Sequence, residues 1–215
     1  MTDRSHPELP GALADPGVPL ADRAEAWPVE SSSRPYETSF ISVHEDVVRG
    51  RDGSTFTRAA VEHDDAVGIM AMDEQERLLL LHQYRHPVRH RLLQPPAGLL
   101  DVPGEDPLAA ARRELFEEGH VRAADWRWLV DAYSSPGFTT ERWRVFLARD
   151  LRPVAEADRH VGQHEEADME IVWAPLDEVV EQIFVGRISD GLLVMGALAC
   201  WAARHREGYA ALRPA

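Results

Sequence analysis

The chain has 215 residues, of which 44% are hydrophobic and 28% charged, a composition typical of a globular protein with one main domain. Its net charge of −14 argues against a surface for nucleic acid or anionic membranes, and no apolar run reaches the roughly 20 residues of a membrane span. The single cysteine, Cys200, excludes an internal disulfide and fits a reducing compartment. We therefore expect a cytoplasmic protein with neither a nucleic-acid nor a membrane partner.

The first third of the chain changes from proline-rich to strand-like. Six prolines within residues 1–35 predict an extended arm. Residues 36–48 and 54–61, on either side of a turn at residues 50–53, predict two strands. Residues 67–72 and 77–83 predict a second hairpin, and its run of four leucines, Leu78 to Leu81, is typical of a central strand buried on both faces.

A basic group follows in this otherwise acidic chain, formed by Arg85, Arg89 and Arg91. Guanidinium groups bind phosphate oxygens in a bidentate manner, so these arginines are candidate phosphate contacts. The alternative is that they are surface arginines that pair with nearby acids.

A helix is predicted over residues 106–118. Asp106 is a good N-cap, Pro107 suits the first helical position and Gly119 suits the residue after the last turn. Helical spacing places three apolar residues on one packing face: Leu108, Ala111 and Leu115.

Three glutamates, Glu114, Glu117 and Glu118, gather beside that face. Like charges at i,i+4 destabilise a helix, and anions in its last turn oppose the dipole. Arg113 can offset only part of this repulsion. A solvated acidic face is one interpretation, and a site for a hard divalent cation such as Mg²⁺ or Mn²⁺ is the other.

The spacing around this helix favours the metal site. It reads G-x6-E-x7-R-E-L-x-E-E from Gly98 to Glu118. This resembles the Nudix box of the Nudix hydrolases, G-x5-E-x7-R-E-U-x-E-E-x-G-U, where U is a bulky aliphatic residue. The loop before Glu105 is one residue longer, and His120 stands where the family has its last glycine.

The resemblance implies a fold class and an organisation. We expect an α/β protein, a Nudix α/β/α sandwich with a mixed sheet, plus a small N-terminal antiparallel β-subdomain. The expected divisions are an arm at residues 1–35, the subdomain at 36–63, the Nudix domain at 64–206 and a tail at 207–215. The subdomain exchanges between protomers in similar enzymes, so the resemblance also implies a homodimer.

The resemblance further implies ligands for the metal and contacts for the substrate. The carbonyl of Ala97, with Glu114, Glu117 and Glu118, would hold one to three Mg²⁺ or Mn²⁺ ions. Gln83-Tyr84-Arg85 and Ser135-Pro136-Gly137-Phe138 resemble segments of the ADP-ribose pyrophosphatase branch. The implied substrate-binding residues are Tyr84, Arg85, Gln94, Pro136, Gly137 and Phe138, with Gln94 standing where the family usually has glutamate.

Residues 160–170 are rich in polar and ionisable groups just before a predicted strand. A solvated loop is the simpler interpretation. Its place in the chain resembles that of the loop that supplies the catalytic carboxylate in this branch, which implies Glu166 as the base and Glu165 as second candidate, acting beside Glu118. Strands are predicted at residues 126–132 and 142–148, and helices at 176–185 and 189–206, the last starting at Ser189 or Asp190.

The predicted function is metal-dependent hydrolysis of the diphosphate of ADP-ribose, or a close nucleoside diphosphate-sugar, to AMP and ribose 5-phosphate. The small-molecule substrate could instead be another nucleoside diphosphate derivative, such as a dinucleotide or a coenzyme A derivative. A third possibility is a catalytically silent Nudix module that binds ADP-ribose.

Overall fold

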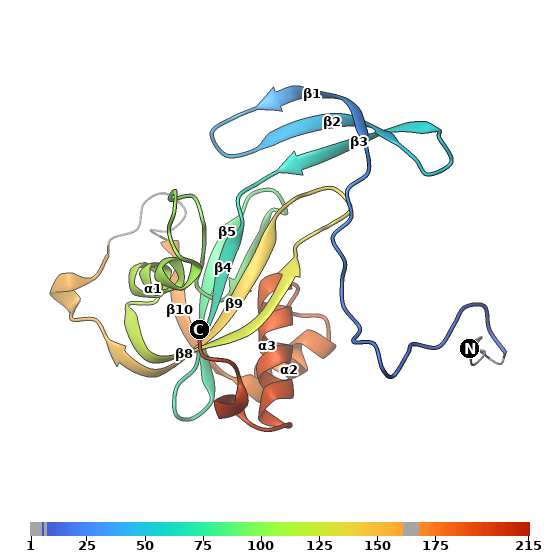
Figure 1. Ribbon diagram of the computed structural model, residues 1–215. Helices are drawn as coiled ribbons and strands as arrows, with labels where there is room; N and C mark the ends of the chain where they lie inside the picture. Colours follow the sequence, from blue (N-terminus) through green and yellow to red (C-terminus); the bar gives the residue numbers. More distant parts are fainter. Residues whose placement is uncertain (1–5, 7, 161–167) are drawn as a thin grey trace. The chain divides into compact units, whose positions relative to one another are not determined.

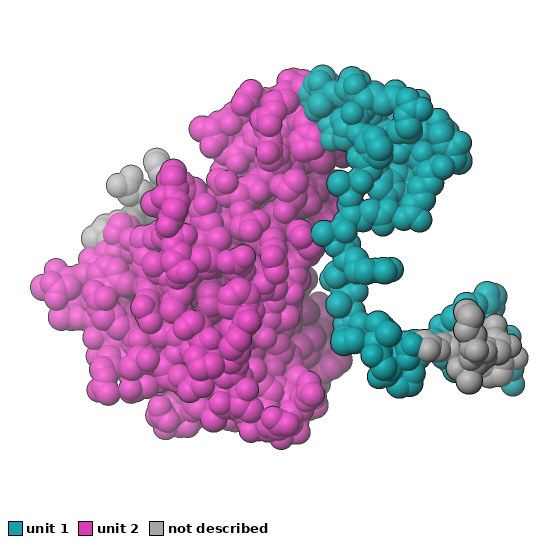
Figure 2. Space-filling view, viewed as in Figure 1, with its two compact units in different colours: residues 1–33, 45–58 teal, residues 34–44, 59–215 magenta. Residues whose placement is uncertain are grey.

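The computed structural model describes residue 6 and residues 8–160 and 168–215. It divides into two compact units, one of residues 1–33 and 45–58, the other of residues 34–44 and 59–215 (Figure 2). In the parts that the structure describes, no helix has the length and apolar character needed to cross a membrane.

Three N-terminal strands form an antiparallel sheet in the order β1-β2-β3. They are β1 (Val29–Glu37), β2 (Ser42–Arg49) and β3 (Thr55–Glu62). The strand β1 starts at Val29, inside the stretch from which we expected an extended arm. All nine of its residues are exposed, so its sequence lacks the apolar alternation that would have revealed it. Within the smaller unit, the rings of Trp27 and Phe56 meet edge to face with centroids 6.2 Å apart.

The larger unit is an α/β/α sandwich in which two sheets lie between helices (Figure 1). A mixed sheet has the order β7-β4-β9-β8, with β4 parallel to β9 and antiparallel to β7. Its strands are β4 (Ala66–Ala71), β7 (Ala97–Leu99), β8 (Val121–Tyr133) and β9 (Arg142–Pro153). The second sheet has the order β10-β5-β6, with β5 (Arg77–Arg85), β6 (His90–Gln94) and β10 (Glu170–Pro175). The expected fold class is confirmed.

The predicted hairpin of residues 67–72 and 77–83 forms only at its turn and is wrong along its strands. An antiparallel bridge between Met72 and Leu78 and a hydrogen bond from Asp73 N–H to the Arg77 carbonyl close the turn, but β4 and β5 lie in different sheets. One edge of β4 pairs along its whole length with β9, and the other pairs with β7 at Ala66, Val67 and Gly68, so only the end of β4 remains for β5. The strand β5 is instead central in its own sheet, and Leu78 to Leu81 are buried as expected.

Alternate residues of β4 and β5 face two separate cores. Val67, Ile69 and Ala71 pack with Leu79 and Leu81 against the helix α1 (Pro107–Glu117). On the other face, Met70, Met72, Leu78 and Leu80 pack against α2 (Leu176–Phe184) and α3 (Gly191–Arg204). Because side chains alternate along a strand, both faces of the sheet layer bury apolar residues. Two short 3₁₀ turns, Glu156–Asp158 and Tyr209–Ala211, complete the described elements.

Candidate active site

The helix α1 carries the predicted glutamates and begins where expected. The side chain of Asp106 accepts hydrogen bonds from the backbone N–H groups of Leu108 and Ala109, at 2.9 and 3.3 Å. Ala110, Ala111 and Leu115 are fully buried against the sheet. This packing fixes the rotation of the helix and directs the acidic side chains toward one cavity.

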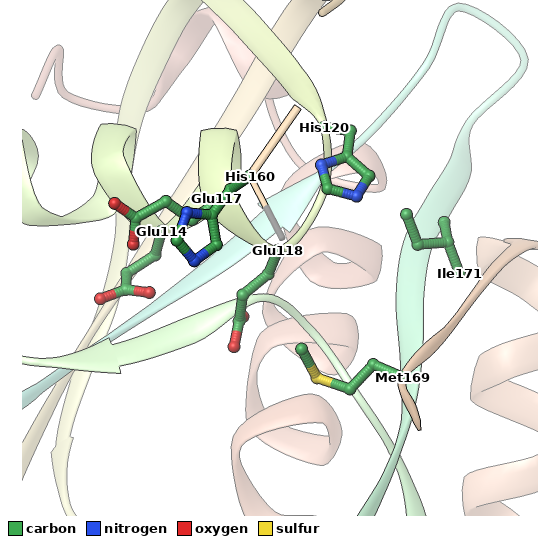
Figure 3. Close-up of a pocket in the computed structure, with 7 residues that line it drawn as sticks. All are labelled: Glu114, Glu117, Glu118, His120, His160, Met169 and Ile171. Carbon is green, nitrogen blue, oxygen red and sulfur yellow. The ribbon is translucent and has the colours of Figure 1, made fainter. Parts of the chain in front are cut away.

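That cavity has a volume of about 80 Å³ and is lined by Glu114, Glu117 and Glu118 (Figure 3). The rest of its wall consists of His120, His160, Met169 and Ile171. We call it the glutamate cavity. The sequence prediction that these three carboxylates gather at one place is in agreement with this arrangement.

Arg113 bridges the acidic residues of the motif. Its guanidinium donates to both oxygens of Glu105, at 3.3 and 3.1 Å, and to Oε1 of Glu114 at 2.5 Å. Its Nη1 also lies 3.5 Å from Glu117 Oε2. These carboxylates raise the pKa of Arg113 further above its ordinary value, first through the hydrogen bonds to Glu105. One permanently charged side chain therefore reduces the repulsion that the glutamate spacing creates.

Gly98 and Ala97 hold two of the glutamates against β7. A Cβ on Gly98 would lie 2.0 Å from Oε1 of Glu114, so only glycine leaves room for this nearly buried carboxylate. The backbone N–H of Ala97 donates to Oε2 of Glu118 at 2.9 Å. The first glycine of the motif thus has a steric role in seating Glu114.

The donor set suits a hard divalent cation, because three carboxylates of one helix line a single small cavity. Among the described residues, no three acidic, histidine or cysteine side chains are close enough together to form a ready metal cage. Glu114 is bound to Arg113 and Glu118 to the Ala97 amide, so a cation would compete with these contacts. The carboxylates are oxygen donors of the kind that such a cation takes, and the assignment of Glu114, Glu117, Glu118 and the Ala97 carbonyl as its ligands stays a prediction.

His120 replaces the family's glycine but keeps a glycine-like backbone. Its φ is 54°, in the left-handed region that glycine adopts without cost. Its Nδ1 is buried. Burial first, and then the positive charge of Arg159, lower the pKa of His120. The left-handed turn after α1 is therefore kept, and the His120 ring forms part of the wall of the glutamate cavity.

We expect His120→Gly to keep the free energy of unfolding within about 1 kcal/mol of the wild type, because glycine relieves the left-handed strain but gains freedom when unfolded. His120→Val should be less stable than the glycine variant by about 1–2 kcal/mol, because a β-branched residue opposes this φ. Urea unfolding of the three proteins measures the difference. Equal stability of the valine and glycine variants would contradict a strained turn.

A second, larger cavity of about 460 Å³ adjoins the glutamates. Glu114 and Glu118 line it too, together with Ala97 and two predicted substrate-binding residues, Arg85 and Gln94. We call it the arginine cavity. Its volume lies in the range of small-ligand sites. The structure therefore places Arg85 and Gln94 in the same cavity as three of the four predicted metal ligands, Ala97, Glu114 and Glu118.

The other predicted substrate-binding residues do not line either cavity in this chain. The hydroxyl of Tyr84 lies 3.3 Å from Nδ1 of His86. Pro136, Gly137 and Phe138 lie in the connection between β8 and β9. Phe138 is 56% exposed, and its carbonyl accepts from the Val61 N–H at 2.7 Å. Roles for these residues stay predictions.

The predicted bases Glu165 and Glu166 lie outside the described residues. The described residues on either side of this segment make contacts near the site. His160 and Met169 line the glutamate cavity, and Arg91 donates to the Asp168 carbonyl at 3.0 Å and to its carboxylate. Arg91 therefore pairs with an acidic residue, which agrees with the alternative to a phosphate contact that the sequence left open for this arginine.

Sequence reasoning missed several residues of the arginine cavity. His63 and Glu141 line it, with 3.9 Å between Nδ1 and Oε1, and the ring of Phe40 meets His63 edge to face. Asp190 was predicted only as a possible helix start, yet it also lines this cavity. These positions are distant in the chain, and no local pattern in the sequence connects them.

Comparison with known proteins gives matches that cover most of the chain. The NUDIX domain matches residues 62–191. The ADP-ribose pyrophosphatase of Mycobacterium tuberculosis (strain ATCC 25618 / H37Rv) is 41% identical over 184 residues, 86% of each chain. The methanol dehydrogenase activator of Bacillus methanolicus is 30% identical over 155 residues, 72% of this chain and 82% of its own.

The crystal structure of an ADP compounds hydrolase superposes with a TM-score of 0.73 at 19% identity, covering 87% of this chain and 99% of its own, which supports the fold. The domain match covers the motif, the glutamate cavity and both sheets of the larger unit, and the identity to the mycobacterial protein extends over 86% of the chain. The chain belongs to the Nudix family.

Proposed function

We propose that this Nudix protein hydrolyses the diphosphate bond of ADP-ribose, or a close nucleoside diphosphate-sugar, to AMP and ribose 5-phosphate. The observation that carries the proposal is the pair Glu114 and Glu118, which line both the glutamate cavity and the arginine cavity. A diphosphate next to Arg85 would lie beside the predicted metal ligands. The similarity to the ADP-ribose pyrophosphatase of M. tuberculosis favours this substrate.

The chemistry requires neutralised phosphoryl oxygens and an activated water. Bound Mg²⁺ or Mn²⁺ would supply charge neutralisation and a more acidic water. Among this chain's own residues, Arg85 would bind a phosphate oxygen through its guanidinium. Glu166, or Glu165, would accept the proton of the attacking water. The water oxygen would form a new P–O bond while the P–O bond to the bridging oxygen breaks, which leaves two phosphate monoesters.

The test is a panel of nucleoside diphosphate derivatives incubated with purified protein and Mg²⁺ or Mn²⁺, with products identified by chromatography. We expect AMP and ribose 5-phosphate from ADP-ribose, and no turnover in a metal chelator. Rapid cleavage of another derivative with ADP-ribose left intact would reject this substrate. Binding of ADP-ribose without cleavage of any compound would favour the silent module.

We further propose that the protein is cytoplasmic and forms a homodimer. The location is supported by Cys200, a buried thiol whose pKa is raised by burial to about 12, which makes it an unreactive core residue rather than half of a disulfide. The homodimer is tested separately. Light scattering on the purified full chain measures the mass of the assembly, and a monomer across the micromolar range would reject the dimer.

A further inference from the structure

Three side chains form a continuous chain of hydrogen bonds along the wall of the arginine cavity. Arg85 Nε donates to Gln94 Oε1 at 2.8 Å, and Gln94 Nε2 donates to Asp190 Oδ2 at 2.6 Å. The other oxygen of Asp190, Oδ1, accepts from the backbone N–H of Leu193 at 2.8 Å. The first residue lies on β5, the second on β6, and Asp190 caps α3. Three elements are thus connected by one set of polar contacts.

The Arg85 guanidinium and the Asp190 carboxylate fix the orientation of the Gln94 amide between them. A guanidinium can only donate and a carboxylate can only accept, so Gln94 must turn its oxygen to Arg85 and its nitrogen to Asp190. Gln94 is only 8% exposed, which leaves few alternative partners for its amide. A glutamate at this position would place a second carboxylate against Asp190, and like charges at this distance repel. A neutral amide at position 94 is therefore the group that can bind both Arg85 and the Asp190 carboxylate.

The hydrogen bond to Gln94 uses only Nε of Arg85 and leaves the two terminal nitrogens of its guanidinium as possible donors to a ligand. Within the described residues, the Arg85 guanidinium makes no hydrogen bond or ion pair besides the one from Nε to Gln94. Arg85 lines the cavity, so its two terminal nitrogens are the donors that remain for a bound anion. A side chain with several rotatable bonds binds more weakly when nothing orders it beforehand. Fixing Nε thus prepares the terminal nitrogens for a phosphate.

We propose that Asp190, acting through Gln94, is a positioning residue that orients Arg85 toward the diphosphate of the substrate. The inference rests on the proposed function for the identity of that substrate. Asp190 has a second role as N-cap of α3, and the two roles use different oxygens of one carboxylate.

A pair of complementary substitutions separates positioning from helix capping. Asp190→Asn keeps a good N-cap, but its single carbonyl oxygen cannot serve both Leu193 and Gln94. We expect KM for ADP-ribose to rise roughly tenfold, the scale of one hydrogen bond to a charged group, with kcat changed less than about twofold. Gln94→Glu alone should also raise KM roughly tenfold, because two carboxylates then face each other.

The double variant, Gln94→Glu with Asp190→Asn, should restore KM to within about threefold of the wild type. The carboxylate introduced at position 94 would accept from Arg85 and from the new amide at position 190, so the contacts are rebuilt with the two groups exchanged. Asp177→Asn is the matched control, since Asp177 pairs with Arg204 and lines neither cavity. It should leave KM unchanged.

Two outcomes would overturn the inference: single variants with wild-type KM, or a double variant whose losses add instead of recovering. A wild type that leaves ADP-ribose intact would reject the proposed function instead. The wild type, the two single variants and the double variant would then be compared by calorimetric titration with ADP, whose diphosphate probes the orientation of Arg85. The expected pattern is roughly tenfold weaker binding in each single variant and recovery in the double variant.

Discussion

Glu118→Gln should lower the turnover of ADP-ribose by at least about 10²-fold, the scale of losing one preorganised electrostatic group in an active site. Glu118 lines both cavities, so its charge acts on the predicted metal site and on the substrate next to it. Glutamine has the same size, and its carbonyl oxygen can still accept from the Ala97 N–H that now bonds to Glu118. The fold should therefore persist while the charge is lost.

Steady-state kinetics with saturating Mg²⁺ measure this loss, and a thermal melt checks the fold. Glu178→Gln is the matched control, because Glu178 is an exposed helical glutamate of α2 that lines neither cavity. Its turnover should equal that of the wild type. Near wild-type turnover in Glu118→Gln would remove this residue from the metal assignment.

Gly98→Ala should reduce turnover by about 10²-fold although it adds only one methyl group, since misplacing an active-site group by about 1 Å has effects of this size. The new Cβ would lie 2.0 Å from Oε1 and 2.1 Å from Cδ of Glu114, far inside van der Waals contact. The carboxylate must move, and with it the ion pair to Arg113. Stability should also fall, because Glu114 is nearly buried and has little room to turn.

Kinetics and urea unfolding of the same preparation separate the two effects. Gly17→Ala is a suitable control, since the nearest atom to its Cβ, Oδ1 of Asp15, would be at an ordinary 3.4 Å. If Gly98→Ala retained full turnover, the position of the Glu114 carboxylate would not matter for catalysis.

The sequence predicted those parts of the site that depend on local spacing. The helix α1, its Asp106 cap and its apolar face follow from residues within four positions of each other, and the structure agrees. The steric reason for Gly98 was not predictable, because it depends on β7 being placed beside α1. Likewise, the pairing of Gln94 with Asp190 joins residues 96 positions apart.

The errors in the fold have a common cause. Propensity identified the strands β4 and β5 but not their partners, and strand pairing depends on which edges the remaining chain leaves available. The strand β1 was missed because all its residues are exposed, so apolar periodicity carried no signal. The roles of Tyr84 and Phe138 stay predictions, since a motif gives residue types and spacing but not which cavity a side chain lines.

The alternation along β4 also affects how this protein can change in evolution. Ile69 belongs to the core that packs against α1, whereas its neighbour Met70 belongs to the core that packs against α2 and α3. In that second core, a Cβ added to Gly196 would lie 2.7 Å from the Met70 side chain. The two faces involve different partners, and changes of side-chain volume at residues with no shared partners are close to additive when they lie more than about 7–10 Å apart. A change deep in the α2 and α3 core is therefore expected to leave the packing that seats Glu114 and Glu118 intact, provided that Asp190 keeps its contact with Gln94.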